Sequence, residues 1–312
     1  MTLSALGIFS AAGAGPLAPV RLAVAGYFAG GHDTDALTAA VNKFLFPAET
    51  RSTLGTGLSE AKWLLAGMAN SGVAGYVGGG DAGAGGAKDS VDKFAFPADT
   101  RTTLGTGLST ANRRLSALAN SGVAGYFIGG NALGRDANKF AFPSDTRSTL
   151  TNVLAANKEN ISGMSNVAVA GYVAGGGNTV VDKITFPGDT SSTLGTGLSG
   201  NRSNLGGMAN NGVAGYFTGG VNVSTLLTTV DKFAFPSDTQ STLGTGLSSA
   251  RSGNAAMANT GVGGYVGGGG TSGGRVTTVD KFAFPADTRS TLGTGLAIAT
   301  DNLSAMADEG VF

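Results

Sequence analysis

One motif recurs six times along this chain, at intervals of 44 to 50 residues, and it limits the possible folds more than any other feature. The motif is Gly-Tyr-x-x-Gly-Gly, and each copy is followed by a segment that begins with Lys and ends with Phe-Pro. A repeat of this length predicts a solenoid, a propeller or an array, because one unit cannot bury its own apolar face. The tyrosines occur only in these copies, at Tyr27, Tyr76, Tyr126, Tyr172, Tyr216 and Tyr265.

Each unit predicts four antiparallel strands. Residues 108–120 alternate larger and smaller side chains and form a first strand, and 123–130 form a second strand that ends in glycines. Residues 91–96 predict a third strand ended by proline, and 102–108 a fourth. A helical reading is disfavoured because two or more glycines per turn cost about 1 kcal/mol each. An open β-solenoid remains the alternative.

The two ends of the repeat favour a closed ring. The first unit begins at its second strand, residues 24–31, whereas 299–311 near the C-terminus align with a first strand. Pairing these two segments completes a sixth blade and removes the exposed edges of an open array. We therefore predict an all-β, six-bladed propeller over residues 20–312, preceded by a separate segment at 1–19.

Composition excludes several classes of function. Twenty basic and 20 acidic residues give zero formal charge, so no global field attracts nucleic acid. The chain has no cysteine, which rules out thiolate chemistry, and no apolar stretch of the length that membrane insertion needs. Residues 1–19 lack the basic start of a secretory signal, since the first positive side chain is Arg21.

The unit resembles the kelch repeat of β-propellers in its glycine pair, its aromatic third strand and the basic residue that opens the next first strand. The basic residue is present in four copies, at Lys62, Lys158, Arg202 and Arg251, and is replaced by Asn112 and Thr300 in the others. Kelch units usually carry a tryptophan on the fourth strand, whereas the single Trp63 lies on a first strand here. The leucines of Leu-Gly-Thr-Gly-Leu are expected to fill that space.

The amino-acid sequence of residues 279–296 is similar to that of kelch-like proteins of marine and cyanobacterial tailed phages, and residues 4–8 resemble the start of phage structural proteins. This resemblance implies a non-enzymatic component of a virion that is assembled in the host cytoplasm, as part of a tail, a fibre or a capsid decoration. Its partners would be other virion proteins, in several copies per particle, and a host-surface glycan or protein. The alternative is a propeller that binds carbohydrate or protein outside any virion.

Residues for catalysis are scarce, which disfavours a hydrolase. His32 is the only histidine, and none of the four glutamates recurs at an equivalent position, so we expect no catalytic residue, metal or cofactor. Residues 270–274 match G-x-S-x-G by letters, but we interpret them as a loop. The repeated Asp-Lys pair of the third strand predicts ion pairing between blades, and the aspartate of the following turn predicts turn capping. The repeated phenylalanines predict core between blades.

Binding is expected where the units differ most, in the loops that join the second and third strands. These loops run from four residues at 177–180 to ten at 81–90, and variable loops on a rigid scaffold commonly carry specificity. Drift of exposed glycine loops remains an alternative. The candidate binding residues are His32, Asp33, Asp35, Asp81, Lys88, Asn131, Arg135, Asn178, Asn222, Thr271 and Arg275.

The N-terminal segment predicts an anchor. It is largely apolar and lies outside the repeat, so a free tail would gain too little contact to offset its ordering entropy. We expect Leu3, Leu6, Ile8 and Phe9 to be buried against another subunit or virion protein. Packing of this segment across its own propeller is the alternative.

Overall fold

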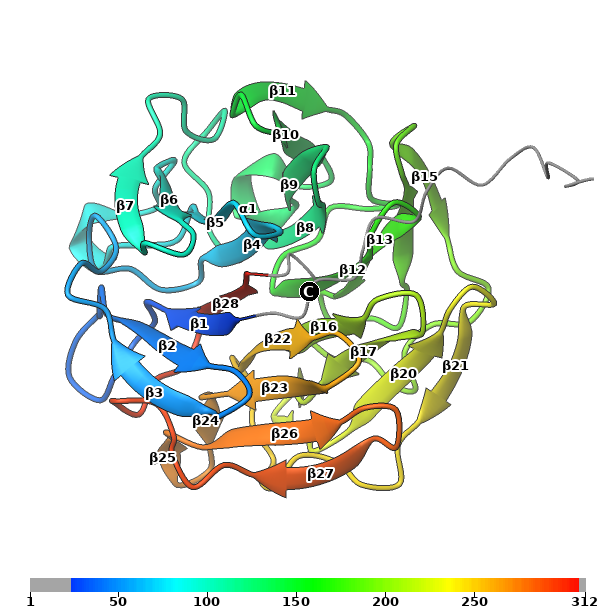
Figure 1. Ribbon diagram of the computed structural model, residues 1–312. Helices are drawn as coiled ribbons and strands as arrows, with labels where there is room; N and C mark the ends of the chain where they lie inside the picture. Colours follow the sequence, from blue (N-terminus) through cyan, green and yellow to red (C-terminus); the bar gives the residue numbers. More distant parts are fainter. Residues whose placement is uncertain (1–23, 309–312) are drawn as a thin grey trace, which may run out of the picture.

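Six four-stranded antiparallel sheets surround a central channel in a computed structural model that describes residues 24–308 (Figure 1). The predicted six-bladed propeller is therefore confirmed, whereas the N-terminal segment and its proposed anchor residues lie outside the described residues. We number the blades along the chain and name their strands A to D from the channel outward.

The strands of each blade are as follows. Blade 1 consists of β28 (Ser304–Ala307), β1 (Ala25–Ala29), β2 (Val41–Leu45) and β3 (Thr50–Thr53), and blade 2 of β4 (Ala66–Asn70), β5 (Ala74–Gly78), β6 (Val91–Ala95) and β7 (Thr100–Thr103). Blade 3 consists of β8 (Ser116–Asn120), β9 (Ala124–Ile128), β10 (Ala137–Ala141) and β11 (Thr146–Leu150), and blade 4 of β12 (Ile161–Asn166), β13 (Ala170–Gly175), β14 (Asp182–Thr185) and β15 (Thr190–Thr193). Blade 5 consists of β16 (Gly206–Asn210), β17 (Ala214–Thr218), β20 (Val230–Ala234) and β21 (Thr239–Thr242), and blade 6 of β22 (Ala255–Asn259), β23 (Gly263–Gly267), β26 (Val279–Ala283) and β27 (Thr288–Thr291).

The ring closes between the two ends of the chain. β28 pairs antiparallel with β1, with Tyr27 opposite Met306, so the last strand of the sequence is strand A of the first blade. The six A strands also pack against one another around the channel, β28 against both β4 and β22. The expected closure is thus confirmed, and each blade gains a neighbour on both sides.

Two predicted boundaries were wrong. Strand D begins at the threonine after the C–D turn and ends before the Leu-Gly-Thr-Gly-Leu segment, which forms the D–A loop instead. Strand A is correspondingly shorter and begins near Ser116 in blade 3. Short elements that the sequence did not predict occupy the B–C loops: a 3-10 turn at Gly83–Gly85, helix α1 at Gly130–Leu133, and the hairpins β18–β19 (Val221–Asn222, Thr225–Leu226) and β24–β25 (Gly270–Thr271, Gly274–Arg275).

The first glycine of each Gly-Tyr motif makes room for an inner side chain of the preceding blade. A Cβ built on Gly264 would lie 2.3 Å from Sδ of Met208, and one on Gly75 would lie 2.3 Å from Sδ of Met306. No side chain fits there, so glycine is required by close approach. The strand A residues that fill these gaps are all fully buried: Met68, Leu118, Met164, Met208, Met257 and Met306.

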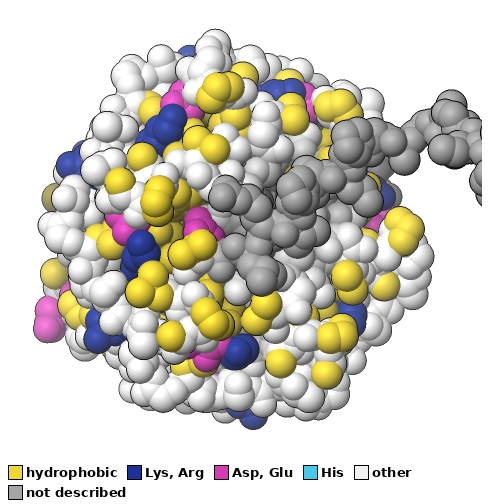
Figure 2. Space-filling view, viewed as in Figure 1, with side chains coloured by type: hydrophobic (Ala, Val, Ile, Leu, Met, Phe, Trp, Pro, Cys, Tyr) yellow, Lys and Arg dark blue, Asp and Glu magenta, His cyan; other side chains and the backbone are white. Residues whose placement is uncertain are grey.

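A second contact joins neighbouring blades on the face that carries the A–B and C–D turns, which we call the turn face. In blade 1 the Tyr27 hydroxyl donates to Oδ1 of Asp99 in the C–D turn of blade 2, at 2.7 Å. Lys43 Nζ contacts Oδ2 of the same aspartate at 2.5 Å. Basic and acidic side chains accordingly lie next to one another around this face (Figure 2).

The same contact occurs at all six blade seams. Its carboxylates are Asp99, Asp145, Asp189, Asp238, Asp287 and, at the seam from blade 6 to blade 1, Glu49. The prediction that these aspartates cap their own turns was wrong, because their side chains reach across to the preceding blade. Burial, followed by the hydrogen bond to the carboxylate, raises the pKa of each tyrosine far above its ordinary value.

Four blades also contain a buried ion pair between strand C and the preceding D–A loop. The N–O distances are 4.0 Å for Lys62–Asp92, 2.6 Å for Lys158–Asp182, 2.8 Å for Arg202–Asp231 and 3.0 Å for Arg251–Asp280. In the other two blades both charges are absent: the two positions hold Asn112 and Asn138 in blade 3, and Thr300 and Asn42 in blade 1, all of them buried. An unpaired buried charge is costly, so each pair behaves as a unit. The predicted pairing between blades is thus correct for the strand C lysines but wrong for these aspartates.

Candidate functional site at the channel mouth

The D–A and B–C loops open onto the face opposite the turn face, which we call the mouth face. Each D–A loop enters strand A through a residue with positive φ, and the six such residues surround the channel. Their φ values are 56° at Leu64, 60° at Arg114, 56° at Asn160, 53° at Asn204, 65° at Gly253 and 50° at Asn302. The N–H of each donates to the carbonyl of its counterpart in the preceding blade, at 2.7 to 3.0 Å, which completes a closed ring of six hydrogen bonds. The mouth is therefore held by main-chain contacts that do not depend on side-chain identity.

Two of the six ring residues are of types that disfavour positive φ. Asparagine and glycine, which tolerate positive φ, occupy four of the six positions. Leu64 and Arg114 occupy the other two, where such a conformation costs on the order of 1 kcal/mol or more. Backbone strain of this kind clusters at functional sites. The strained backbone at Leu64 and Arg114, in the adjacent blades 2 and 3, therefore makes this side of the mouth the candidate site.

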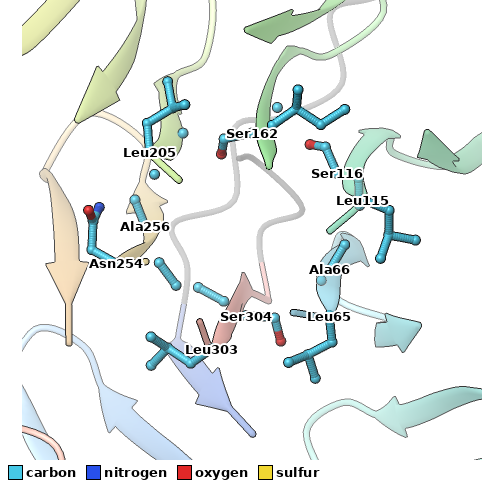
Figure 3. A pocket seen from close by; sticks show the side chains of 18 residues that line it. Leu65, Ala66, Leu115, Ser116, Ser162, Leu205, Asn254, Ala256, Leu303 and Ser304 are labelled. Carbon is cyan, nitrogen blue, oxygen red and sulfur yellow. The ribbon is translucent and has the colours of Figure 1, made fainter. Parts of the chain in front are cut away.

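The channel continues below the ring. A cavity of about 60 Å³ at the mouth is lined by the ring residues, and one of about 90 Å³ lies deeper among the first residues of the A strands. Figure 3 shows this deeper part, in which Ser116, Ser162 and Ser304 and the small Ala66 and Ala256 surround the axis. Each A strand pairs on one side only, so its other edge presents N–H and C=O groups to the channel. Strand A of each blade therefore lines the channel.

The residues just outside the ring differ from blade to blade. In order from blade 2 they are Trp63, Arg113, Glu159, Ser203, Ser252 and Asp301. Large or charged side chains thus occupy blades 1 to 4, while blades 5 and 6 present two serines. Because the backbone has nearly sixfold symmetry, this difference gives the mouth one side with large or charged side chains and one side with small serines.

Contacts among these groups hold the bulky side in place. Arg113 pairs with the buried Asp81 of the B–C loop in blade 2, and Arg114 Nη1 lies 3.2 Å from Glu159 Oε1. The Arg114 and Glu159 side chains are 36% and 42% exposed, so both reach solvent at the mouth. The His32 ring packs against Trp63 at a centroid distance of 5.3 Å.

Most of the binding residues predicted in the B–C loops have structural partners. Asp33 accepts hydrogen bonds from the N–H groups of Asp35 and Ala36, which lowers the pKa of Asp33. Asp35 and Asn222 are exposed. The remaining contacts are Lys88 with Glu60 at 3.0 Å, Asn131 with the Arg113 N–H, Arg135 with Asn152, Asn178 with the Val180 N–H, Thr271 with the Gly274 carbonyl, and Arg275 with Asp301 at 3.0 Å.

Four of the predicted residues contact the mouth residues, and five mouth residues were missed. His32, Asp81 and Arg275 contact Trp63, Arg113 and Asp301 respectively, and Asn131 accepts from the Arg113 N–H. Arg135 contacts Asn152 instead, and Asn222 is exposed on its own hairpin. Trp63, Arg113, Arg114, Glu159 and Asp301 belong to the D–A loops, which were not considered as binding segments. An alignment of the six units could have found these residues, because the positions just before strand A vary between units whereas the leucine or isoleucine that follows recurs in five of them.

Other classes of site are not found within residues 24–308. No group of three or more His, Cys, Asp or Glu side chains there could hold a metal ion. Among the described helices, none is long and apolar enough to span a membrane. Residues 270–274 form the β24–β25 hairpin, and the strand-to-helix elbow of a serine hydrolase is absent from it.

The fold defines the chain as a six-bladed β-propeller, and comparison with known proteins agrees. The solved structure of YjhT is similar, with a TM-score of 0.65 and 14% identity, over 89% of this chain and 99% of that one. At this identity the likeness shows the fold alone, and 402 solved chains share it, so it does not discriminate among functions. No family model and no curated protein sequence matches the chain.

Proposed function

We propose that this propeller is a non-enzymatic binding and structural protein of a tailed-phage particle, which uses its mouth face for recognition. The observation that carries the proposal is the contrast between the two faces. The turn face repeats one tyrosine–carboxylate–lysine contact at every seam, whereas the B–C loops and the residues beside the ring on the mouth face vary between blades. Variable loops on a rigid scaffold commonly carry binding specificity.

The chemistry of the mouth supports binding. Its charged groups are paired, Arg113 with Asp81, Arg114 with Glu159 and Arg275 with Asp301, so each already has a counter-ion. A general acid or base needs a proton-transfer group that is free to reach substrate. His32 Nδ1, the obvious candidate, lies 2.5 Å from the Asp33 carbonyl.

The assignment to a virion is supported by the resemblance of residues 279–296 to kelch-like phage proteins. In this proposal residues 1–19 dock onto another virion protein, several copies occur per particle, and the mouth faces outward toward a host-surface glycan or protein. Mass spectrometry of purified particles tests the setting directly. Absence of the protein from the particles would contradict the virion assignment and leave the mouth as a binding site to be tested separately.

Binding at the mouth is tested with labelled protein on host cells. Arg114→Ala removes the exposed guanidinium, and we expect it to reduce cell binding several-fold while the melting temperature is kept. Arg51→Ala, which removes a guanidinium from the outer strand β3 of blade 1, where strand C has no aspartate, is the control. Equal loss of binding in both variants would argue against recognition at the mouth.

A second candidate, a propeller that binds carbohydrate outside a virion, is favoured by Trp63. This partly buried indole precedes the ring residue Leu64 and packs on His32, while Asn160, Asn204 and Asn302 lie on the ring itself. Apolar ring faces together with planar polar groups suit sugar recognition. Binding of the wild type to a glycan array, together with absence from particles, would select this candidate over the first.

A further inference from the structure

A pocket of about 280 Å³ opens at the seam between blades 3 and 4, away from the channel. It is lined by Asn152, Leu154 and Ala155 of the loop that leaves blade 3, and by Asp182 and residues 191–193 of blade 4. β15 is the outermost strand of its blade, so the pocket lies at the rim of the disc (Figure 1). Its one charged lining residue, Asp182, is 1% exposed and belongs to the buried pair with Lys158.

The pocket exists because blade 4 lacks two large side chains that the other blades carry. The residue at this place in strand D is Arg51, Arg101, Arg147, Gln240 or Arg289 in the other five blades, and Ser191 in blade 4. The strand C residue directly opposite is phenylalanine in those five blades and Ile184 here. Both substitutions remove volume, and a long donor side chain is missing from the space.

In the three sister blades that have a strand C aspartate, blades 2, 5 and 6, that long side chain lies over it. Arg101 Nη1 is 3.6 Å from Asp92 Oδ1, and Arg289 Nη1 is 3.9 Å from Asp280 Oδ1. In blade 5 the Gln240 amide donates to Asp231 at 3.0 Å. The aspartates of blades 2 and 6 therefore each face two cations, one from the D–A loop and one from strand D.

Asp182 also receives fewer hydrogen bonds than its counterpart in blade 5. Asp231 accepts from the Ser199 N–H and hydroxyl, Arg202, Gln240 and Thr242. Among the described residues, Asp182 accepts only from the Ala155 N–H, at 2.8 Å, and from Lys158 Nζ, at 2.6 Å. Alanine replaces the serine, and Thr193, opposite Asp182 in the ladder, makes no bond to it. An ionised carboxylate has about four acceptor sites, so acceptor capacity is left on the pocket side.

We propose that the blade 4 pocket binds a guanidinium group, supplied by an arginine side chain of a partner protein. The arginine would occupy the space that the chain's own strand D arginine fills in four sister blades. There it would contact Asp182 as a second cation beside Lys158, and its further N–H groups would meet the hydroxyls of the 191–193 segment. A planar guanidinium matches a carboxylate better than an ammonium does. This site is separate from the mouth and does not rest on the virion assignment.

The test uses the full chain and a capped arginine, N-acetyl-arginine amide, titrated by calorimetry and by NMR. We expect saturable binding with a millimolar dissociation constant, as for a single side chain. The capped citrulline analogue keeps the shape without the charge and is expected to bind at least tenfold more weakly. Equal binding of both compounds, or no saturable binding of the arginine compound, overturns the proposal.

Variants locate the site. Ser191→Arg supplies the guanidinium from the chain itself and should abolish binding while raising the melting temperature, and Ser191→Gln should do the same with the residue type of blade 5. Thr190→Arg is the control, since it adds the same charge to the exposed residue whose side chain points to the other face of β15. Binding that persists in both Ser191 variants overturns the proposal, as does its loss in the Thr190 variant.

Discussion

Raising the pH should unfold this propeller steeply, because six buried tyrosines hold it together. Each is about 1% exposed or less and donates its hydroxyl hydrogen to a carboxylate of the next blade. Ionised tyrosine cannot donate that hydrogen and would place two negative charges in contact. Folding therefore raises the tyrosine pKa, with burial as the first cause and the carboxylate as the second.

The sign and size of the effect follow from linkage. Because the folded-state pKa is raised, the stabilisation is complete below the unfolded-state pKa of about 10, and is lost as the pH rises from there toward the folded-state value. In that window the native state holds one more proton per tyrosine than the unfolded state. Six protons at about 1.36 kcal/mol each give an upper limit of about 8 kcal/mol lost per pH unit. A domain with a stability of about 5–15 kcal/mol should unfold within one to two pH units.

Urea unfolding at a series of pH values from about 9 upward, with tyrosinate absorbance recorded alongside, measures this loss. We expect the fold and the tyrosine protons to be lost together. Tyr172→Phe is the matched variant, since it should reduce the slope by about one sixth, or roughly 1.4 kcal/mol per pH unit. If the tyrosines ionise one by one while the protein stays folded, the claim that their buried hydroxyls stabilise the seams is refuted.

Three further predictions test the ring, its core and its loops. Deleting residues 298–312 removes strand A of blade 1 and should abolish the cooperative melting transition, so a truncated chain that melts like the full one contradicts closure. Met208→Asp should cost several kcal/mol in urea unfolding, whereas Met208→Leu, the residue type at this place in blade 3, should cost under about 1.5 kcal/mol. Replacing 221–229 by 177–180 should keep the melting temperature and change partner binding, and unchanged binding to every candidate partner would favour loop drift.

The fold could be predicted from the sequence because its determinants are local and are repeated six times. Copies of the Gly-Tyr motif mark strand B, Phe-Pro marks the end of strand C, and the surplus strand A at 299–311 indicates closure. Strand D was misplaced because Leu-Gly-Thr-Gly-Leu alternates like a strand. The structure shows that Gly57 needs close approach instead, since a Cβ there would lie 2.2 Å from the Ala39 carbonyl oxygen.

The candidate sites were harder to predict because they depend on differences between copies, and the significance of a difference depends on three-dimensional neighbours. Trp63 and Arg113 looked like ordinary strand residues until the closed main-chain ring placed them at the channel mouth. Ser191 looked like an unremarkable surface residue. The Arg101–Asp92 contact of blade 2 shows that the equivalent residue there places a cation over the strand C aspartate.

Six nearly identical blades could pack against the wrong neighbours. An alternation of large and smaller side chains at the seams disfavours such mispacking. The residue after the strand B tyrosine alternates between Phe and Val around the ring, and each Phe packs on a small residue of the preceding blade. The Phe residues are Phe28, Phe127 and Phe217, and the small residues are Gly267, Gly78 and Ala174. A Cβ on Gly78 would lie 2.6 Å from Cζ of Phe127, so slipping the ring by one blade creates clashes at some seams and gaps at others.

A double-mutant cycle at the seam between blades 2 and 3 tests this matching. Gly78→Ile alone should destabilise the protein by several kcal/mol through overlap with the buried Phe127 ring, and Phe127→Val alone by about 1–3 kcal/mol through the cavity it leaves. Together they reproduce the Ile128 and Val173 combination of the next seam, which is fully buried in one cluster. The double variant should therefore be more stable than Gly78→Ile, with a coupling of at least about 1 kcal/mol in urea unfolding. Simple additivity of the two single effects would mean that the alternation does not set the order of the blades.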